Sequence, residues 1–317
     1  MVGSRSNKFI KLATLSVVIP LFNEETLVDN LVSRIVPILK GITADFEIIF
    51  VDDGSKDSTL AKLIRARDSE PRIKILELSK NFGHQAAFTA GLSCAKGEYT
   101  VMMDGDLQDP PELIPVMCRM LLSDEYDVVF GKRTNKANLN RRNLLTLSFH
   151  KTFKRFSDLP DIDNMGNFSA MNRLALNALL QFSESIRYLP GLRHFIGFRQ
   201  GYVEYRREER HQGKSKMNYF RLLSLSSDAI FSFSKFPIRL CLFLGIIGII
   251  VFFLAGLYTL IAKIAGFAII GWSSTLLSIY FLGSIQLTFL GVIGEYIYRI
   301  YKESQHRPSF FIRKFHE

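Results

Sequence analysis

The stretch that decides the fold runs from residue 99 to residue 112 and reads Tyr99-Thr100-Val101-Met102-Met103-Asp104-Gly105-Asp106-Leu107-Gln108-Asp109-Pro110-Pro111-Glu112. Its first five residues carry no charge, which is typical of a strand that is buried on both faces. Asp104 and Asp106 follow at once and flank a glycine, so a tight turn can bring both carboxylates towards one point. Asp109 with the two prolines and Glu112 behind it then predicts a helix start with Asp109 as the N-cap.

Similar uncharged or β-rich runs recur along the first half of the chain, with helical segments between them. The predicted strands are Leu15–Ile19, Phe46–Val51, Ile73–Leu78, Tyr99–Met103 and Tyr126–Phe130. Strands that alternate with helices in this way favour an α/β fold in which a mainly parallel sheet is covered on both faces. Ligands bind beyond the carboxyl ends of the strands in such sheets, so the residues just after each run are the candidates for a site.

Acidic residues do follow those runs. Asp52 and Asp53 come after the second run, and Asp104 and Asp106 come after the fourth. Carboxylates gathered at one edge repel one another, so the pattern predicts a bound cation. Mg²⁺ and Mn²⁺ prefer carboxylate oxygens and complete their shell with substrate phosphates, and Gln108 could add a carbonyl oxygen. Asp52 and Asp53 are equally well interpreted as turn residues or as acceptors for a base N–H and ribose hydroxyls.

Two long uncharged stretches occupy the C-terminal third. Leu240 to Ala262 contains no charged residue, and a second uncharged stretch runs from Ala265 to Gly294. Each is long enough to cross a bilayer as a helix, so the pair predicts a transmembrane hairpin. Basic residues lie outside the pair and only Lys263 lies between the spans, so the positive-inside rule places both ends in the cytoplasm. An N-terminal signal peptide is rejected because Glu24 and Glu25 follow the apolar stretch without a cleavage site.

These boundaries divide the chain into a cytosolic α/β domain over 1–219, a juxtamembrane interfacial helix over 220–237, two transmembrane helices within 238–299 (about 238–262 and 270–297), and a basic cytosolic tail over 300–317. The formal charge of +10, from 40 basic and 30 acidic residues, gathers at the membrane, which argues against a nucleic-acid partner. The three cysteines are widely spaced and predict neither a zinc site nor a disulfide framework.

The motifs together resemble glycosyltransferase family 2, and more narrowly the polyprenyl-phosphate glycosyltransferases, a group that contains GtrB-type bactoprenol glucosyltransferases and dolichol-phosphate mannose synthase. The resemblance covers nearly the whole chain. The segments that carry it are Val18–Glu25, Asp53–Asp57, Asn81–Gly83, Asp104–Glu112, Phe231–Ser234 and Gly291–Tyr296, together with Arg210, Gly213, Ser215 and Lys216.

The resemblance implies a GT-A fold and an inverting, metal-dependent transfer of a hexose from a nucleotide-sugar to polyprenyl (undecaprenyl) phosphate at the inner membrane of a bacterium. UDP-glucose is the expected donor, with a UDP-N-acetylhexosamine, UDP-aminoarabinose or GDP-mannose as alternatives, and a homo-oligomer such as a tetramer is expected. The resemblance also implies roles for single residues. Mg²⁺ or Mn²⁺ and the diphosphate would be held by Asp104, Asp106 and Gln108. The nucleotide-sugar would be bound by Pro20, Phe22, Glu24, Asp52, Asp53 and Asp104, and the acceptor phosphate by Arg133, Arg141, Arg142, Arg210 and Lys216.

One departure from the resemblance concerns the candidate base. Where GtrB-type enzymes resemble one another in Gly-Asp-Phe, this chain has Gly166-Asn167-Phe168. Asparagine cannot take a proton, but a phosphomonoester is largely dianionic at neutral pH and can attack without a general base. We therefore predict that Asn167 positions substrate in the catalytic site, with Asp163 as the fallback base. The non-enzymatic alternative is a membrane scaffold that binds nucleotide-sugar without catalysis.

Overall fold

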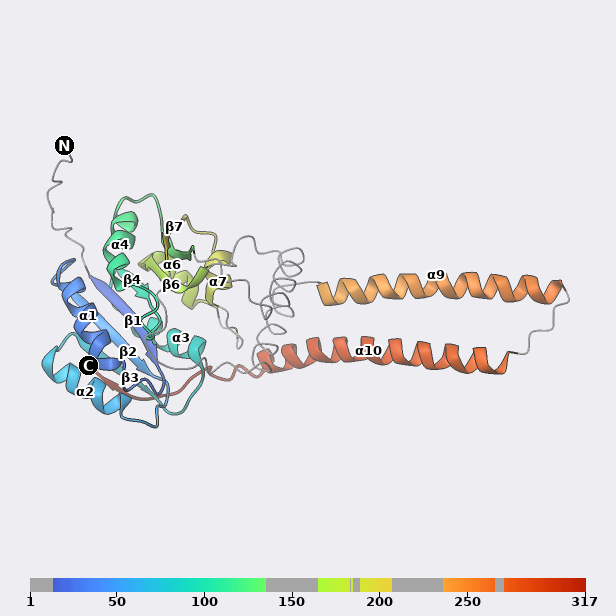
Figure 1. Ribbon diagram of the computed structural model, residues 1–317, viewed down its shortest axis with the longest axis horizontal. Coiled ribbons are helices and arrows are strands. Elements are labelled where there is room, and N and C mark those ends of the chain that lie inside the picture. The colour runs from blue at the N-terminus through green and yellow to red at the C-terminus, as the bar shows by residue number, and fades with distance from the viewer. Residues whose placement is uncertain (1–13, 135–164, 183, 185–188, 207–235, 266–270) are drawn as a thin grey trace. The chain divides into compact units, whose positions relative to one another are not determined.

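The computed structural model describes residues 14–134, 165–182, 184, 189–206, 236–265 and 271–317. The chain divides into two compact units. The first comprises Met1–Arg142, Asp161–Lys216 and Arg307–Glu317, and the second comprises Asn143–Pro160 and Met217–His306. Figure 1 shows the sheet and its covering helices in the first unit and two long helices in the second.

The first unit is built on one eight-stranded sheet. Its strands, in chain order, are β1 (Leu15–Leu21), β2 (Phe46–Asp52), β3 (Ile73–Leu78), β4 (Tyr99–Met102), β5 (Val128–Arg133), β6 (Met165–Asn172), β7 (Gln200–Tyr205) and β8 (Ile312–His316). In space their order is β7-β5-β6-β4-β1-β2-β3-β8. Strands β1 to β4 are mutually parallel, as are β5 and β7, whereas β6 runs antiparallel to both of its neighbours and β8 runs antiparallel to β3.

This topology assembles one edge of the sheet from distant parts of the chain. Because β6 runs antiparallel between β4 and β5, those two strands point the same way and end at the same edge. The amino end of β6 lies at that edge too. The residues that follow β1, β2 and β4 therefore meet the last residues of β5 and β7 and the first residues of β6.

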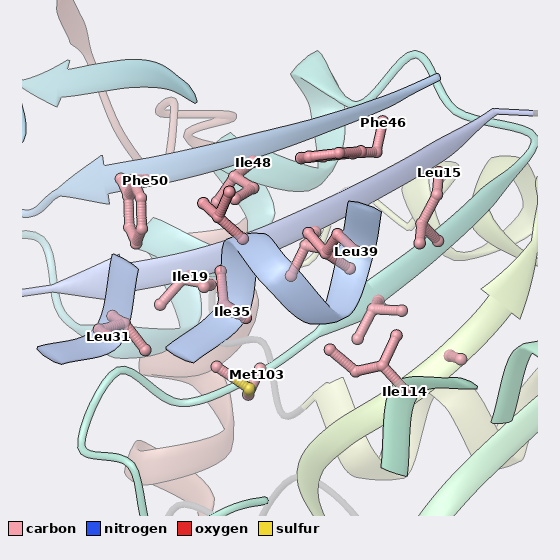
Figure 2. Packing of buried hydrophobic residues seen from close by; sticks show 14 of the residues in the cluster. Leu15, Ile19, Leu31, Ile35, Leu39, Phe46, Ile48, Phe50, Met103 and Ile114 are labelled. Carbon is pink, nitrogen blue, oxygen red and sulfur yellow. The ribbon is translucent and has the colours of Figure 1, made fainter. Parts of the chain in front are cut away.

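Helices cover both faces of the sheet, and alternate residues of each strand pack on opposite faces. One face packs on α1 (Val28–Lys40), α2 (Thr59–Ser69) and α4 (Ile114–Leu122), with Ile19 of β1 in that core (Figure 2). The other face packs on α3 (His84–Cys94), α6 (Arg173–Leu180) and α7 (Leu189–Phe195), with Val18 of β1 in the second core. Burial on both faces explains why β1 is uncharged and why five of the seven residues of β2 are apolar.

The second unit contains the helices α9 (Phe236–Ile264) and α10 (Trp272–Ser304). Within α10 the segment Phe281–Ser304, 24 residues with a mean hydropathy of 1.2, is long and apolar enough to cross a membrane, and Phe243–Tyr258 in α9 is a shorter apolar stretch. Large apolar side chains on both helices are exposed, for example Phe253 and Leu287. A two-helix transmembrane hairpin remains a prediction.

The α/β class with a mainly parallel sheet is confirmed, and each of the five predicted strands corresponds to an observed strand with an end shifted by at most a few residues. Three strands were not predicted. β6 (Met-Gly-Asn-Phe-Ser-Ala-Met-Asn) has a glycine, two asparagines and no β-branched residue, and β8 lies in the segment predicted only as a basic tail. All three cysteines are free; Cys118 is buried, whereas Cys94 and Cys241 are partly exposed.

Candidate functional site

The loop that follows β4 carries the predicted metal ligands, and two backbone features fix its path. A side chain at Gly105 would clash with Leu21 and its Cβ would lie 3.1 Å from the carbonyl oxygen of Pro20, so only glycine lets the loop pack on the end of β1. Leu107 is buried and has a positive φ of 57°, which reverses the chain. The backbone N–H of Gln108 then donates to Asp106 Oδ1 at 3.2 Å. The aspartate-glycine-aspartate motif thus forms a tight, internally bonded turn.

Within the described part of the chain, two side chains contact Asp104, and both meet its Oδ1. His84 Nε2 lies 2.9 Å from this oxygen, and Asn167 Nδ2 donates to it at 3.3 Å. His84 is the first residue of α3 and Asn167 lies at the amino end of β6. The motif on β4 is therefore joined to two elements that lie 20 and 63 residues away in the sequence.

The direction of the Asn167 amide follows from a chain of hydrogen bonds. The backbone N–H of Leu189 can only donate, and it donates to Gln85 Oε1 at 3.1 Å. Gln85 Nε2 is therefore turned to Asn167, whose Oδ1 accepts at 3.3 Å. This leaves the Asn167 NH₂ group facing the Asp104 carboxylate, which can only accept when ionised. Asn167 is thus oriented as a hydrogen-bond donor at the site.

The electrostatics around Asp104 and His84 favour the charged forms of these two side chains. Burial by itself raises the pKa of Asp104, but hydrogen bonds from His84 and Asn167 and the positive charges of His84 and Arg133 outweigh it and lower the pKa below its ordinary value. Burial lowers the pKa of His84, yet its contact with Asp104 and the charges of neighbouring aspartates raise that pKa overall. Asp104 is therefore ionised at neutral pH, as a metal ligand must be.

A buried arginine that the sequence did not reveal fixes the start of β6. Arg193 of α7 has no solvent exposure. Its Nη2 donates to the carbonyl oxygen of Gly166 at 2.7 Å and its Nη1 to that of Asn167 at 2.8 Å, with a further bond to the Ser169 hydroxyl. Its Nε donates to the carbonyl oxygen of Leu189 at 3.3 Å. Arg193 therefore ties α7 to the strand that carries Asn167.

Arg133 is the last residue of β5, and its guanidinium is half-buried beside Tyr205 and Asp109. Its Nε donates to the Tyr205 hydroxyl at 3.2 Å, and its Nη2 lies 3.6 Å from Asp109 Oδ1. The prediction that Asp109 is a helix N-cap is wrong. The N-cap of the short 3₁₀ helix η1 (Pro111–Leu113) is Pro110, no side chain caps it, and the buried Asp109 carboxylate instead accepts from the Tyr205 hydroxyl.

The predicted nucleotide-binding residues lie after β1 and β2. Asp53 is buried, and its two oxygens accept the backbone N–H groups of Phe82 at 2.7 Å and Gly83 at 3.0 Å, which ties β2 to the loop before α3. Asp52 is also buried and accepts from the Ser55 N–H at 3.3 Å. Burial raises the pKa of both aspartates, more than their hydrogen bonds lower it.

The other predicted nucleotide-binding residues lie in β1 and just after it. Pro20 is buried within β1, and Phe22 and Glu24 are partly exposed just after it. The Glu24 backbone N–H donates to Thr59 Oγ1 at 2.9 Å, which fixes the turn while leaving the Glu24 side chain outside that bond. Of the other predicted site residues, Arg141, Arg142, Asp163, Arg210 and Lys216 lie outside the described residues.

Asp104 and Asp106 are hard oxygen donors, which suit Mg²⁺ or Mn²⁺. No group of three or more histidine, cysteine, aspartate or glutamate side chains arranged to hold a metal occurs among the described residues. Two carboxylates suit a cation that is bound jointly with substrate phosphates rather than caged by protein alone. The donor set therefore fits the predicted cofactor.

The sequence located Asp104, Asp106, Asn167 and Arg133, and the structure brings them to one edge. His84, Gln85, Arg193 and Tyr205 were missed. A signal was available for His84, because a residue that opens a helix just after a strand of an α/β sheet lies at the ligand-binding edge. The local sequence gives no such signal for Gln85, Arg193 or Tyr205.

The fold and the acidic turn define an α/β protein with a candidate cation site at the carboxyl edge of its sheet. The profile described as "Glycosyl transferase family 2" matches residues 16–180, and the chain belongs to this family. It is 38% identical to an uncharacterised glycosyltransferase of Synechocystis sp., over 94% of each chain. It is 35% identical to a bactoprenol glucosyl transferase of Shigella phage SfV, over 94% of this chain and 98% of the relative, and 34% identical to a prophage-derived bactoprenol glucosyl transferase of Shigella flexneri, over 95% and 98%.

Among solved structures, glucosyl-3-phosphoglycerate synthase from Mycobacterium tuberculosis, in complex with Mn²⁺, uridine diphosphate and glucosyl-3-phosphoglycerate, is 20% identical with a TM-score of 0.49, and the match covers 69% of this chain and 77% of that one.

Proposed function

We propose that this chain transfers glucose from UDP-glucose to polyprenyl phosphate, of which undecaprenyl phosphate is the expected form, at the cytosolic face of a bacterial inner membrane. The observation that carries the proposal is the assembly of Asp104, Asn167 and Arg133 at one edge of the sheet, in a chain whose relatives named bactoprenol glucosyl transferase align along almost its full length. The apolar helix segment Phe281–Ser304 supports attachment to the membrane.

Asp104 and Asp106, with Gln108, would hold Mg²⁺ or Mn²⁺ against the donor diphosphate, and the metal would act as a Lewis acid on the departing nucleoside diphosphate. Phe22 and Glu24, next to the buried Pro20, and the Asp52-Asp53 pair would bind the nucleotide. Asp53 holds the turn before α3 in place, which gives this pocket a fixed wall.

Arg133 would bind the acceptor phosphate, because a planar guanidinium suits phosphate oxygens. An oxygen of the phosphate dianion attacks the anomeric carbon, the bond from that carbon to the diphosphate breaks, and its electron pair leaves with UDP, so the configuration inverts. No proton has to move, because the phosphomonoester is already largely dianionic at neutral pH. Asn167 then serves as a donor at the reacting centre, in agreement with its fixed amide direction.

We further propose that α9 and α10 form the two membrane spans, with the sheet domain and both chain ends in the cytoplasm, as the distribution of basic residues favours. Arg141, Arg142, Arg210 and Lys216 would extend the acceptor site, and the chain would assemble as a homo-oligomer.

The test uses the purified full chain with undecaprenyl phosphate, Mg²⁺ or Mn²⁺ and a panel of donors: UDP-glucose, a UDP-N-acetylhexosamine, UDP-aminoarabinose and GDP-mannose. Mass spectrometry of the lipid is expected to show one added hexose with UDP-glucose and none after chelation of the metal. The double variant Asp104→Asn with Asp106→Asn is the matched control and is expected to give no product. Product with another donor would correct the sugar, and no product with any donor would favour the scaffold instead.

A further inference from the structure

Arg133, Tyr205 and Asp109 contact one another at the ends of β5 and β7. Tyr205 is the register partner of Arg133 across the β5–β7 pair, and both are the last residues of their strands. The Tyr205 hydroxyl accepts from Arg133 Nε and donates to Asp109 Oδ1, and the same Oδ1 lies 3.6 Å from Arg133 Nη2. Each group therefore contacts the other two.

Burial stabilises this arrangement of the three side chains. Asp109 is fully buried and Tyr205 is 6% exposed, whereas the Arg133 side chain keeps 25% of its surface accessible. Turning Arg133 away would separate a buried carboxylate from its cation, which is costly. Burial and the charge of Asp109 raise the pKa of Tyr205, so it remains a neutral phenol that can both donate and accept. Two edges of the guanidinium are thus held from inside the domain.

Two glycines make room for the group. A Cβ at Gly166 would lie 2.6 Å from Arg133 Nη2, so the start of β6 presents bare backbone to the guanidinium. A Cβ at Gly131 would lie 2.8 Å from the Tyr205 ring and 2.7 Å from Phe168, whose ring packs edge-on against Tyr205 with centroids 5.8 Å apart. The position of Arg133 is therefore specified by β5, β6, β7 and the Asp109 loop together.

We infer that Asp109 and Tyr205 are positioning residues for the acceptor phosphate, because they hold the Arg133 guanidinium in the direction in which it meets a phosphomonoester. The inference rests on the proposed function, in which Arg133 binds that phosphate. It also gives the aspartate of the Gln108-Asp109-Pro110-Pro111 block a role distinct from metal binding and from helix capping.

The primary test is Tyr205→Phe, which removes one hydroxyl and keeps the ring that packs on Phe168. The expected result is a rise of about tenfold in the KM for undecaprenyl phosphate, the typical effect of losing a hydrogen bond to a charged group, with the KM for the sugar donor and kcat changed less than about twofold. Tyr202→Phe is the matched control: Tyr202 lies on the same strand, is 55% exposed, and is expected to leave all three constants unchanged.

Two further variants separate positioning from a structural role. Gly166→Ala pushes the guanidinium aside without touching Asp109 or Tyr205 and is expected to raise the KM of the acceptor in the same way, so the inference stays testable if Tyr205→Phe does not fold. In an Arg133→Gln background, Tyr205→Phe is expected to change the KM of the acceptor less than about twofold, because the residue through which it acts is gone.

Equal effects of Tyr205→Phe in both backgrounds, or equal rises in donor and acceptor KM, would overturn the inference. Absence of transfer by the unmodified chain would instead contradict the proposed function.

Discussion

Replacing Arg193 by methionine is expected to destabilise the sheet domain strongly. Among the described residues its side chain is the largest with no solvent exposure, and it contacts the Met102 sulfur and donates to four oxygen acceptors. Three of these are backbone carbonyl oxygens, at Gly166, Asn167 and Leu189. Methionine fills most of the volume but donates no hydrogen bond. Each buried acceptor left without its donor costs about 1–3 kcal/mol, and partial relaxation brings the total to about 4 kcal/mol.

For a domain of about 150–250 residues, 1 kcal/mol shifts the unfolding temperature by about 2–4 °C, so the expected loss is about 8–16 °C. Thermal unfolding of the purified full chain, followed by circular dichroism, measures it. Arg199→Met is the matched control. Arg199 pairs with Asp127 at 3.0 Å, but its side chain is 57% exposed, and surface pairs contribute about 0–1 kcal/mol.

Arg193→Lys tests the geometry of the contacts. Lysine keeps the charge but cannot reach three carbonyl oxygens with a fixed fork, so its unfolding temperature is expected between those of the methionine variant and the unmodified chain. An Arg193→Met protein that melts within about 3 °C of the unmodified chain, as Arg199→Met is expected to, would show that the buried contacts do not hold β6.

Three other changes probe separate features. Glutamate in Gln85→Glu can still accept from the Leu189 N–H but cannot donate to Asn167, so the Asn167 amide should reverse. The expected result is a fall of about tenfold in kcat/KM with an unchanged unfolding temperature, whereas a purely structural role of Gln85 would lower the unfolding temperature. Ion pairs with two cations lower the pKa of Glu70 to about 2 from 4.5. Its ionised form therefore stabilises the fold by about 1 kcal/mol above pH 4.5, and the difference in unfolding free energy between the unmodified chain and Glu70→Gln should vanish as the pH falls towards 2; a constant difference would contradict the ion pairs. Gly105→Val should overpack the turn against Leu21, cost about 1–3 kcal/mol and weaken Mn²⁺ binding, measured by titration; unchanged Mn²⁺ affinity would contradict the close packing.

The central strands could be predicted because burial on both faces leaves a direct mark on composition. β1 and β2 are buried at every position, so their runs of apolar residues stand out. β6 was missed because its residue types suit the contacts that they make and have low strand propensity. Gly166 makes room for Arg133, and Asn167 contacts Asp104. β8 pairs with β3 at the edge of the sheet, and no local pattern distinguishes it from a basic tail.

The same distinction separates the site residues that could be predicted from those that could not. Asp104 and Asp106 lie in one short motif, so spacing alone brings them together. Arg193 donates to backbone carbonyls of β6 and α7, and Gln85 is oriented by the backbone N–H of Leu189. Any residue type can supply a backbone carbonyl or N–H. Such partners leave no sequence pattern at the position that they contact. The contacts emerge only once the strand order is known.

The insertion of β6 between β4 and β5 also bears on the proposed chemistry. Neighbouring strands lie about 4.8 Å apart, so the carboxyl end of β4, which leads into the acidic turn, is separated from that of β5 by about 10 Å. Asn167, on the strand between them, lies beside Asp104. The electrostatic influence of Arg133 reaches Asp104 across this interval. Under the proposed function, a diphosphate held at β4 and a phosphate held at β5 would leave room for one sugar between them, as an inverting displacement requires.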